Sequence, residues 1–484
     1  MIKTRAKVRP LFKRKRDNYA RKLKREKLIK YLQSELRSCT THGLPYIVNM
    51  EIHWTGRLYW AISFVICLGI IVMLLSSQYS RYINSPVVMS VEMDYYNWNV
   101  SYPAITLCPA SNIDQDVFSA LVNETRNKTG KNLHSYYWSL GTISLETVDQ
   151  IAVQTADVVK LLHTKDYAEI AAMLFESFDN GTFMTNINEP ISIEPALTEM
   201  GMCHVINSNV AVLHNPIKWK DEAAAYVKNN IEISAHDVDF YTQIMNYAEV
   251  YKVYVHSPDE IAISTTPSFT YEAEGLLLFG YQVWSAKISD SLRNVPINVR
   301  KCRYIHEPVS DRYPVYSYNH CMLDCRVKMI LTLCGCVPHF YRTLDHEKIC
   351  DFNELLCVIR YKNEIIRLAP SNDTIAKFGH FSSLPRSSSD CGCLGSCEAQ
   401  EYLKDQENFL AQESTSKLRI AISTFPRYRV KREFIFSVHD MILKTGGVIN
   451  LCIGSSVISI MELIMTIIRI PLGNLADWII NKTK

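Results

Sequence analysis

Two long apolar runs constrain the fold of this 484-residue chain more than any other feature. The first holds 23 residues without a charge between Arg57 and Arg81, including WAISFVICLGIIVMLL. The second extends from about Met441 to Ile468. A helix crosses the bilayer core with about 20 apolar residues, so each run predicts one membrane-spanning helix. Two spans put both ends of the chain on the same side of the membrane.

The charges before the first run predict which side that is. Residues 1–57 carry 16 Lys/Arg and 4 Asp/Glu, and the positive-inside rule places such a region in the cytoplasm. A cleaved signal peptide is not expected, because the first apolar run lies behind this long hydrophilic segment. The run KRKRDNYARKLKREK is either a solvated tail or a contact with anionic inner-leaflet lipid. We expect a multi-pass plasma-membrane protein with both termini cytoplasmic.

About 360 residues between the spans should then face the outside of the cell, and the distribution of the cysteines supports this prediction. Twelve of the 15 cysteines lie there, whereas Cys39 is cytoplasmic and Cys67 and Cys452 lie in the spans. An even number of cysteines in an oxidising compartment predicts a disulfide framework. Residues 58–440 carry a net charge of −11, which attracts cations but is explained equally well by solubility. N-glycosylation is expected at the N-x-S/T sites Asn99, Asn123, Asn127, Asn180 and Asn372.

The same segment mixes strand and helix patterns without an internal repeat. Alternating or branched residues predict strands at 104–108, 252–257 and 434–438. Apolar residues at helical spacing predict helices at 145–162, 166–177 and 222–230. We therefore expect one disulfide-rich α+β extracellular domain between two transmembrane helices.

The cysteines are densest from Cys302 to Cys397, where ten occur. CMLDC at 321–325 places two cysteines on one helix face, about 6 Å apart along the axis. CGC at 391–393 places two on one strand face, roughly 6.6 Å apart, so a helix and an extended segment could form two adjacent disulfides. The spacing does not decide which cysteine takes which partner. A zinc cluster is the alternative, but thiols outside the cell are usually oxidised and no His pair has zinc-finger spacing, so no metal is expected.

Small residues and a carboxylate interrupt the second apolar run at LCIGSSVISIME. Gly454, Ser455 and Ser456 are adjacent, and Glu462 follows eight residues after the glycine. A charge in lipid is costly unless its surroundings are polar or wet. One interpretation is a pore, in which small residues let helices approach and Glu462 faces water. The other is that the small residues only pack helices while Glu462 reaches toward a membrane surface. These residues alone do not separate the two.

An enzyme is not expected from the motifs. The sequence lacks a G-x-S-x-G elbow, an H-E-x-x-H motif and a phosphate-binding glycine loop. We expect no cofactor and no nucleic-acid partner.

Longer motifs resemble the degenerin/epithelial sodium channel family, and within it the insect pickpocket branch, from about residue 38 to 470. TTHGLPYI is similar to the family's cytoplasmic His-Gly motif, and YPAITLCP to the signature after its first span. YSYNHCMLDCRVKMILTLCGCVPHFY and CGCLGSC are similar to its thumb cysteines. KREFIFSVHDMILKTGGVINLCIGSSVISIMELI is similar to the approach to its second span. ATP-gated trimeric channels share the two-span plan, but their cysteine spacings differ.

The resemblance implies a homo- or heterotrimer in membrane lipid, around a sodium-conducting pore blocked by amiloride. Gly454, Ser455 and Ser456 would form its selectivity filter. Three copies of Glu462 would form a negative ring that attracts cations. The family's disulfide order would pair Cys108 with Cys203, Cys302 with Cys397, Cys321 with Cys393, Cys325 with Cys391, Cys334 with Cys357, and Cys336 with Cys350.

The resemblance also implies residues that control gating. His42 and Gly43, which alone would be read as a turn, would belong to the gating or permeation segment. The gate would lie between Gly446 and Ser456, a stretch that includes Gly447. Leu443 stands where the family prefers a small residue, and bulk there tends to hold such channels open. Lys444 would oppose cation entry unless it points away or the channel mixes subunits.

The combined expectation is a subunit of a sodium-selective cation channel gated by a ligand or by force. Its parts would be a cytoplasmic region at 1–57, spans at 58–80 and 441–468, an extracellular domain at 81–440 and a tail at 469–484. One alternative is a regulatory, non-conducting subunit of such a channel, which Leu443 and Lys444 favour. Another is a two-span ectoenzyme or receptor. The sequence does not indicate the gating stimulus.

Overall fold

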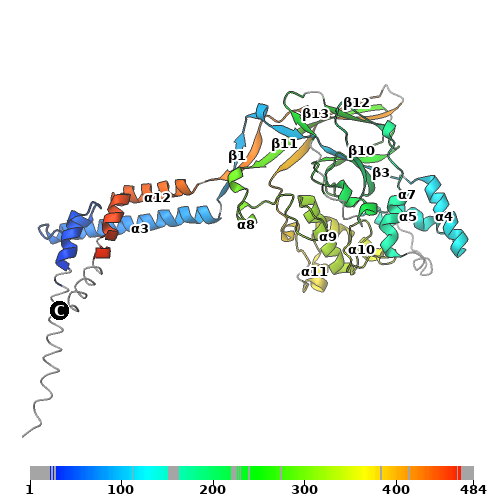
Figure 1. Cartoon of the computed structure of the whole chain (residues 1–484). Coiled ribbons are helices and arrows are strands. Elements are labelled where there is room, and N and C mark those ends of the chain that lie inside the picture. Colours follow the sequence, from blue (N-terminus) through cyan, green and yellow to red (C-terminus); the bar gives the residue numbers. More distant parts are fainter. Residues whose placement is uncertain are drawn as a thin grey trace, which may run out of the picture. The chain divides into compact units, whose positions relative to one another are not determined.

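The computed structural model divides the chain into two units, each described separately below (Figure 1). The helical unit comprises Met1–Val88 and Phe434–Lys484, and the disulfide-rich domain comprises Met89–Glu433. The structure describes residues 22, 26 and 29–469, except 85, 112, 151–162, 220–225, 227, 229–230, 238–239, 273–274, 382–383, 412–414, 436 and 466. Most of the helices expected at 145–162 and 222–230 therefore lies outside the described residues.

The helical unit contains two candidate membrane spans. Helix α3, Trp54–Asn84, has 31 residues and is long and apolar enough to cross a membrane. Helix α12, Val438–Ile453, is followed by a second helical segment that begins at residue 457, and the two are bent by 76°. Together they form the second candidate, so the apolar run at 441–468 is a broken helix. A short helix, α2 (Leu44–Val48), lies just before α3.

The prediction of a strand at 434–438 is wrong beyond its first residue, Phe434. Strand β14, Arg429–Phe434, ends there, and Ser437 caps α12. The Asp440 N–H donates to the Ser437 hydroxyl at 3.1 Å, and the Ser437 N–H donates to the Asp440 carboxylate at 2.9 Å. This reciprocal capping box stabilises the start of the helix, and it prevails over the β-propensity of the Phe, Ile and Val residues nearby.

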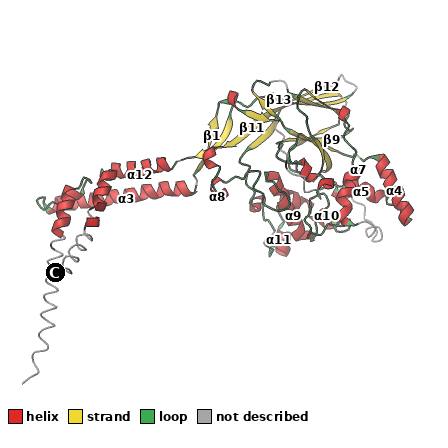
Figure 2. Cartoon of the chain, viewed as in Figure 1, coloured by secondary structure: helices red, strands yellow, loops and turns green. Residues whose placement is uncertain are grey.

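The strands of the disulfide-rich domain form two main sheets (Figure 2). The expected strands at 104–108 and 252–257 are confirmed as β3 and β9. The smaller sheet has the order β10 (Ser268–Tyr271), β9 (Tyr251–His256), β3 (Ala104–Pro109), β6 (Gly201–Ile206) and β5 (Ile193–Thr198). The larger has the order β1 (Val87–Glu92), β14, β11 (Gly275–Ile288), β13 (Ser416–Thr424), β8 (Tyr241–Met245) and β4 (Phe183–Thr185), with β12 (Ala399–Leu410) also paired to β11. Strands β2 (Asn99–Ser101) and β7 (Glu232–Ser234) pair separately.

Strand β11 organises the larger sheet because it is paired along both edges. It runs antiparallel to β12 and parallel to β13 and β14. Its buried residues alternate, and Phe279 and Val283 point into a core shared with Ile105, Leu107 and Val253 of the smaller sheet. The two sheets therefore bury one common apolar layer, as expected for face-to-face packing.

Helices form a second core beside the sheets (Figure 2). The helix expected at 166–177 is confirmed over α7, which ends at Leu174. The expected α+β class is also confirmed, because one domain contains both sheets and helices. The helices of this domain are α4 (Gln115–Thr129), α5 (His134–Thr142), α7 (Tyr167–Leu174), α8 (Ile297–Arg300), α9 (Tyr318–Cys334), α10 (Leu355–Arg367) and α11 (Asn372–Phe378).

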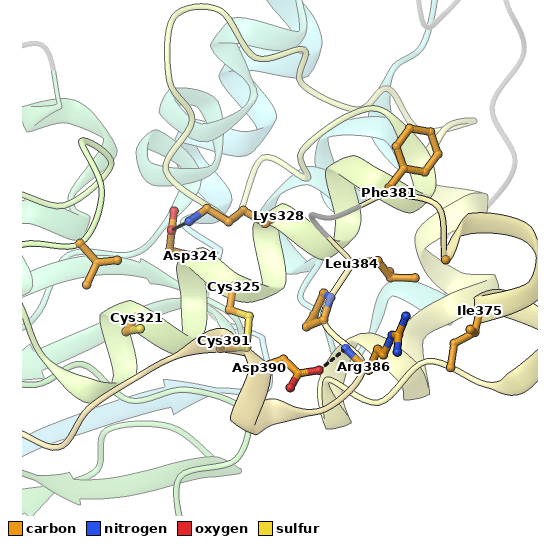
Figure 3. Close-up of a pocket in the computed structure, with 13 residues that line it drawn as sticks. Cys321, Asp324, Cys325, Lys328, Ile375, Phe381, Leu384, Arg386, Asp390 and Cys391 are labelled. Carbon is orange, nitrogen blue, oxygen red and sulfur yellow. Dashed lines mark hydrogen bonds and ion pairs between the residues drawn. A yellow bond between two sulfur atoms is a disulfide. The ribbon is translucent and has the colours of Figure 1, made fainter. Parts of the chain in front are cut away.

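Disulfides cross-link this domain. The bonds are Cys108–Cys203, Cys302–Cys397, Cys321–Cys393, Cys325–Cys391, Cys334–Cys357 and Cys336–Cys350, the same pairs that the family resemblance implied. Two of them, which we call the α9 ladder, leave α9 from Cys321 and Cys325, one turn apart, with Cα–Cα distances of 5.8 Å. Figure 3 shows the Cys325–Cys391 bond beside a pocket, with the Asp324–Lys328 ion pair on the same helix. A disulfide typically stabilises a fold by roughly 2–4 kcal/mol.

A buried ion pair ties α9 to the turn between β5 and β6. Arg326 Nη1 lies 2.5 Å from Glu199 Oε2, and both side chains are fully buried. Glu199 also accepts hydrogen bonds from the Tyr341 hydroxyl at 2.7 Å and the Ser264 N–H at 2.9 Å. Arg326 donates a further bond to the Ile366 carbonyl at 3.2 Å. Loss of one partner would leave the other charge buried and uncompensated.

The substitution Arg326→Met is expected to lower the free energy of unfolding by about 3–5 kcal/mol, because Glu199 would stay buried without its countercharge. Adding Glu199→Gln should restore part of the loss. Tm of the full-length protein in detergent measures both effects. Lys128→Met, which removes an exposed ion pair on α4, serves as the control. Equal Tm values for wild type and Arg326→Met would contradict this account.

Several histidines of the disulfide-rich domain are buried in the neutral form. Burial lowers the pKa of His204, His256 and His339 to about 4 and that of His320 to about 3, and it lowers the pKa of His214 well below its usual range. An unfolded histidine titrates near 6.5, so the unfolded chain binds more protons as the pH falls below that value. Glu260 acts in the opposite direction, because burial, then Glu401 and Asp259, raise its pKa to about 7.

Acidification is therefore expected to lower Tm between about pH 6.5 and pH 4, because the several histidines outweigh the single carboxyl group. His256→Gln should make this dependence shallower, since glutamine can still bond to Thr106 Oγ1, which lies 2.8 Å from His256 Nε2. Scanning fluorimetry at a series of pH values measures the slope. A Tm that rises on acidification would be inconsistent with this balance.

Candidate functional site

The second candidate span breaks at the small residues singled out in the sequence. Gly454 ends α12 in the left-handed region at φ 61°, and its N–H donates to the Asn450 carbonyl at 2.8 Å. A residue with a Cβ is strained in this conformation, which glycine adopts freely. The 76° bend therefore follows directly from the position of a glycine in this apolar run.

The His-Gly motif lies against this break. The His42 N–H donates to the Ile453 carbonyl at 2.9 Å, which satisfies one of the free carbonyls at the end of α12. A Cβ placed on Gly454 would overlap the His42 imidazole ring. Gly43 also has a positive φ of 93°, so the motif turns sharply at its second residue. The structure thus brings two separately predicted motifs into direct contact.

Hydroxyl groups extend this contact through the break and into the helical segment that follows it. Thr41 Oγ1 lies 3.4 Å from Ser455 Oγ, and both residues are buried. Thr40 Oγ1 lies 2.5 Å from Ser459 Oγ, and it donates to Glu462 Oε2 at 3.4 Å. The carboxylate therefore has a polar neighbour from the motif that precedes α3. A run of polar side chains lines one side of an otherwise apolar segment.

Ser456 starts the helical segment that follows the break. Its hydroxyl accepts a hydrogen bond from the Ser459 N–H at 3.2 Å, and its carbonyl accepts one from the Ile460 N–H at 3.1 Å. These are the bonds of a helix N-cap, for which serine is among the preferred residues. Gly454 thus ends one helix and Ser456 begins the next, which leaves Ser455 between them.

The remaining predicted gating residues lie on α12. Leu443 is 72% exposed within this single chain, and Lys444, Gly446 and Gly447 are also exposed. A Cβ on either glycine would meet no atom within 4 Å. These residues do not join the contact between His42 and the break, so the structure brings together one part of the predicted site and leaves the α12 residues apart from it.

Three residues of this site were not expected from the sequence. Thr40, Thr41 and Ser459 supply most of its side-chain hydrogen bonds. Thr40 and Thr41 belong to the TTHGLPYI motif, and Ser459 is a third serine in an apolar run. Serines are unusual in a span that is exposed only to lipid. Their presence in the apolar run was the sequence signal that could have indicated a polar contact here.

The predicted glycosylation sites belong to the disulfide-rich domain. The Asn99, Asn123, Asn127 and Asn372 side chains are exposed, whereas that of Asn180 lies outside the described residues. Asn99 lies in β2 and donates to Glu232 at 3.0 Å. In the described part of the chain, no group of three or more His, Cys, Asp or Glu residues is arranged to hold a metal ion.

Comparison with known proteins identifies the family. The sequence profile described as "Amiloride-sensitive sodium channel" matches residues 36–466, most of the chain. "Sodium channel protein Nach" of Drosophila melanogaster is 21% identical, covering 87% of this chain and 84% of the relative. "Pickpocket protein 28" of the same species is 23% identical, covering 88% and 76%. "Acid-sensing ion channel 2" of Mus musculus is 22% identical, covering 89% and 85%.

The profile match covers the first candidate membrane helix, the domain that follows it and all but the last residues of the second candidate. The chain is therefore a membrane protein of an ion channel family and not an enzyme. It belongs to the amiloride-sensitive sodium channel family.

Proposed function

We propose that this chain is a pore-forming subunit of a sodium-selective, amiloride-blocked cation channel of the plasma membrane. Three subunits, identical or related, would surround the pore, with both termini in the cytoplasm. Gly454, Ser455 and Ser456 would form the selectivity filter. An extracellular ligand or a mechanical force acting on the disulfide-rich domain would open the channel. Carbohydrate would be attached to the extracellular sequons.

The contact between His42 and Gly454 is the observation that carries this proposal. It places polar backbone and hydroxyl groups in the middle of a candidate membrane span, where exposure to lipid would be costly. Broken backbone at membrane depth is tolerated where it is buried in protein or lines water. A pore along this segment meets that requirement.

The chemistry of the segment suits a cation. Carbonyl and hydroxyl oxygens at a constriction replace part of the water shell of an ion, and 454–456 offers both. Glu462 lies two turns beyond Ser455 and is exposed in the single chain. Three copies of this carboxylate would form a ring that attracts Na⁺ and repels anions.

A regulatory, non-conducting subunit is the second candidate function. Lys444 favours this function, because it would place three positive charges near the pore mouth in a homotrimer. Expression of the chain alone, with amiloride-blocked current as the readout, separates the two functions. Current from the chain alone supports a pore-forming subunit, whereas current only with a related subunit supports the second function.

Gly454→Ala is expected to abolish most of the current without preventing surface expression, because alanine at positive φ costs about 1–2 kcal/mol and its Cβ would displace His42. Whole-cell recording and surface biotinylation measure the two properties. The double variant His42→Ala/Gly454→Ala removes the overlap and should recover part of the current.

Gly69→Ala in α3 is the matched control, since a Cβ there meets no atom within 4 Å. It should conduct like the wild type. Normal current from Gly454→Ala would argue against a gating role for the contact.

Ser456→Ala is expected to reduce the preference for Na⁺ over K⁺, because it removes a hydroxyl from the proposed filter. The reversal potential with Na⁺ outside and K⁺ inside measures this preference. Ser76→Ala in α3 is the control, since that hydroxyl donates only to the Met73 carbonyl of its own helix. An unchanged reversal potential in Ser456→Ala would remove Ser456 from the filter.

A further inference from the structure

A cavity of about 680 Å³ lies within the disulfide-rich domain. Its lining comes mostly from the loop that follows β9, the first residues of α9 and the first residues of β12. The Cys302–Cys397 bond holds two further wall residues in place, because Arg303 and Ser396 each adjoin one of the bonded cysteines. Small-molecule sites typically have volumes of about 300–1,000 Å³, so this cavity has room for an organic ligand.

Carboxylates outnumber guanidinium groups in this lining. The carboxylates belong to Asp259, Glu260, Glu398 and Glu401, and the guanidinium groups to Arg303 and Arg432. Asp259 accepts hydrogen bonds from Asn209 and from the Tyr226 hydroxyl, at 2.7 and 3.0 Å. The side chains of the three glutamates form no hydrogen bond or ion pair with any residue that the structure describes. The excess negative charge therefore favours a cationic ligand.

Glu260 is the most enclosed of these glutamates, since Glu398 and Glu401 are exposed. Burial, then the charges of Glu401 and Asp259, raise the pKa of Glu260 to about 7. A carboxylate that is partly removed from water beside other carboxylates is stabilised by a cation placed next to it. A positively charged ligand group would fill this role.

The two arginines of the lining do not supply that countercharge. The Arg303 side chain donates to the Glu307 carbonyl at 3.2 Å, and its guanidinium lies over the Tyr316 ring, 5.5 Å from the centroid. Arg432 lies beside Gly395, where a Cβ would stand 3.6 Å from Arg432 Nη2. Within the described residues, neither arginine forms an ion pair with a carboxylate of the lining.

Apolar and aromatic side chains complete the walls. Ile263 and Met322 are buried, and Tyr318 and Tyr402 line the cavity beside them. The Tyr304 hydroxyl, also in the lining, is buried without a hydrogen-bond partner among the described residues. An unpaired buried hydroxyl is costly unless a ligand bonds to it. Apolar walls with a few polar groups are typical of sites for small organic molecules.

We propose that this cavity binds a small organic amine, in which a protonated amino group is attached to an aromatic or apolar body. The ammonium group donates to the carboxylates of Glu260 and Glu401, and the apolar body packs against Ile263 and Met322. A polar substituent on that body can bond to the Tyr304 hydroxyl. An amine would then be the extracellular ligand of the channel, a consequence that rests on the proposed function, whereas binding rests only on the cavity.

The test is direct binding of phenethylamine to the full-length protein in a non-ionic detergent, measured by isothermal titration calorimetry at pH 8, above the pKa of Glu260. The wild type should bind the amine saturably. Glu260→Gln/Glu401→Gln should weaken binding by at least about tenfold, because both charge-assisted hydrogen bonds are lost. 2-Phenylethanol and phenylacetate, which replace the ammonium with a hydroxyl and a carboxylate, should bind the wild type more weakly by a similar factor.

Asp116→Asn/Glu124→Gln is the matched control, because it removes two exposed carboxylates of α4 that do not line the cavity. It should bind phenethylamine like the wild type. Glu401→Gln alone changes an exposed residue, so it reports on binding even if the double variant fails to fold. An unchanged Tm shows that each variant is folded.

No saturable binding by the wild type would overturn the proposal, as would equal affinities of the wild type and Glu401→Gln. Tighter binding of phenylalanine than of phenethylamine would overturn the assignment to a simple amine, because it would indicate that Arg432 recognises a carboxylate. Because no current is measured, these outcomes are independent of channel activity.

Discussion

The contact of His42 with the end of α12 is the interaction on which the candidate pore depends. A helix that stops within an apolar span leaves carbonyl groups without partners, and lipid cannot supply them. The His42 N–H bonds to one of these carbonyls, and glycine at position 454 leaves room for the imidazole ring. The break and the His-Gly motif therefore require each other. A side chain at 454 would separate them, and without the motif the exposed helix end would lack this partner.

The sequence predicted those parts of the fold that depend on local pattern. Apolar runs located the two spans, and alternation located β3 and β9. The disulfide pairs came from resemblance, because cysteine spacing alone left the choice of partners open. The strand expected at 434–438 does not continue beyond Phe434, because Ser437 and Asp440 form a capping box that starts α12. The contact of His42 with Gly454 could not be predicted, because it joins residues some 400 positions apart and leaves no periodic pattern. The Glu199–Arg326 pair was missed for the same reason.

The two units bury polar groups in different ways. In the disulfide-rich domain, Glu199 and Arg326 lie in a protein core. Glu199 accepts hydrogen bonds from Arg326, the Tyr341 hydroxyl and the Ser264 N–H, whereas Arg326 Nε has no hydrogen-bond partner among the described residues. In the helical unit, hydroxyl groups from Thr40 and Thr41 satisfy serines of a candidate span. The ion pair fixes one geometry, because its separation would leave a buried charge without its countercharge. The hydroxyl contacts use neutral groups, whose hydrogen bonds contribute only about 0.5–1.5 kcal/mol each. Neutral bonds of that size are easily exchanged, which suits the gating movement proposed for this segment.

The α9 ladder has a mechanical consequence. A single covalent tether to α9 would act as a pivot and leave the helix free to turn about its own axis. Two tethers, one turn apart on the same face, remove that rotation, and the segment carrying Cys391 and Cys393 must follow α9 as a rigid piece. A displacement of the far end of α9 is then transmitted to the start of β12, a few residues beyond the second disulfide, with little loss of amplitude. Because the coupling is rigid, the direction of the displacement is preserved as well.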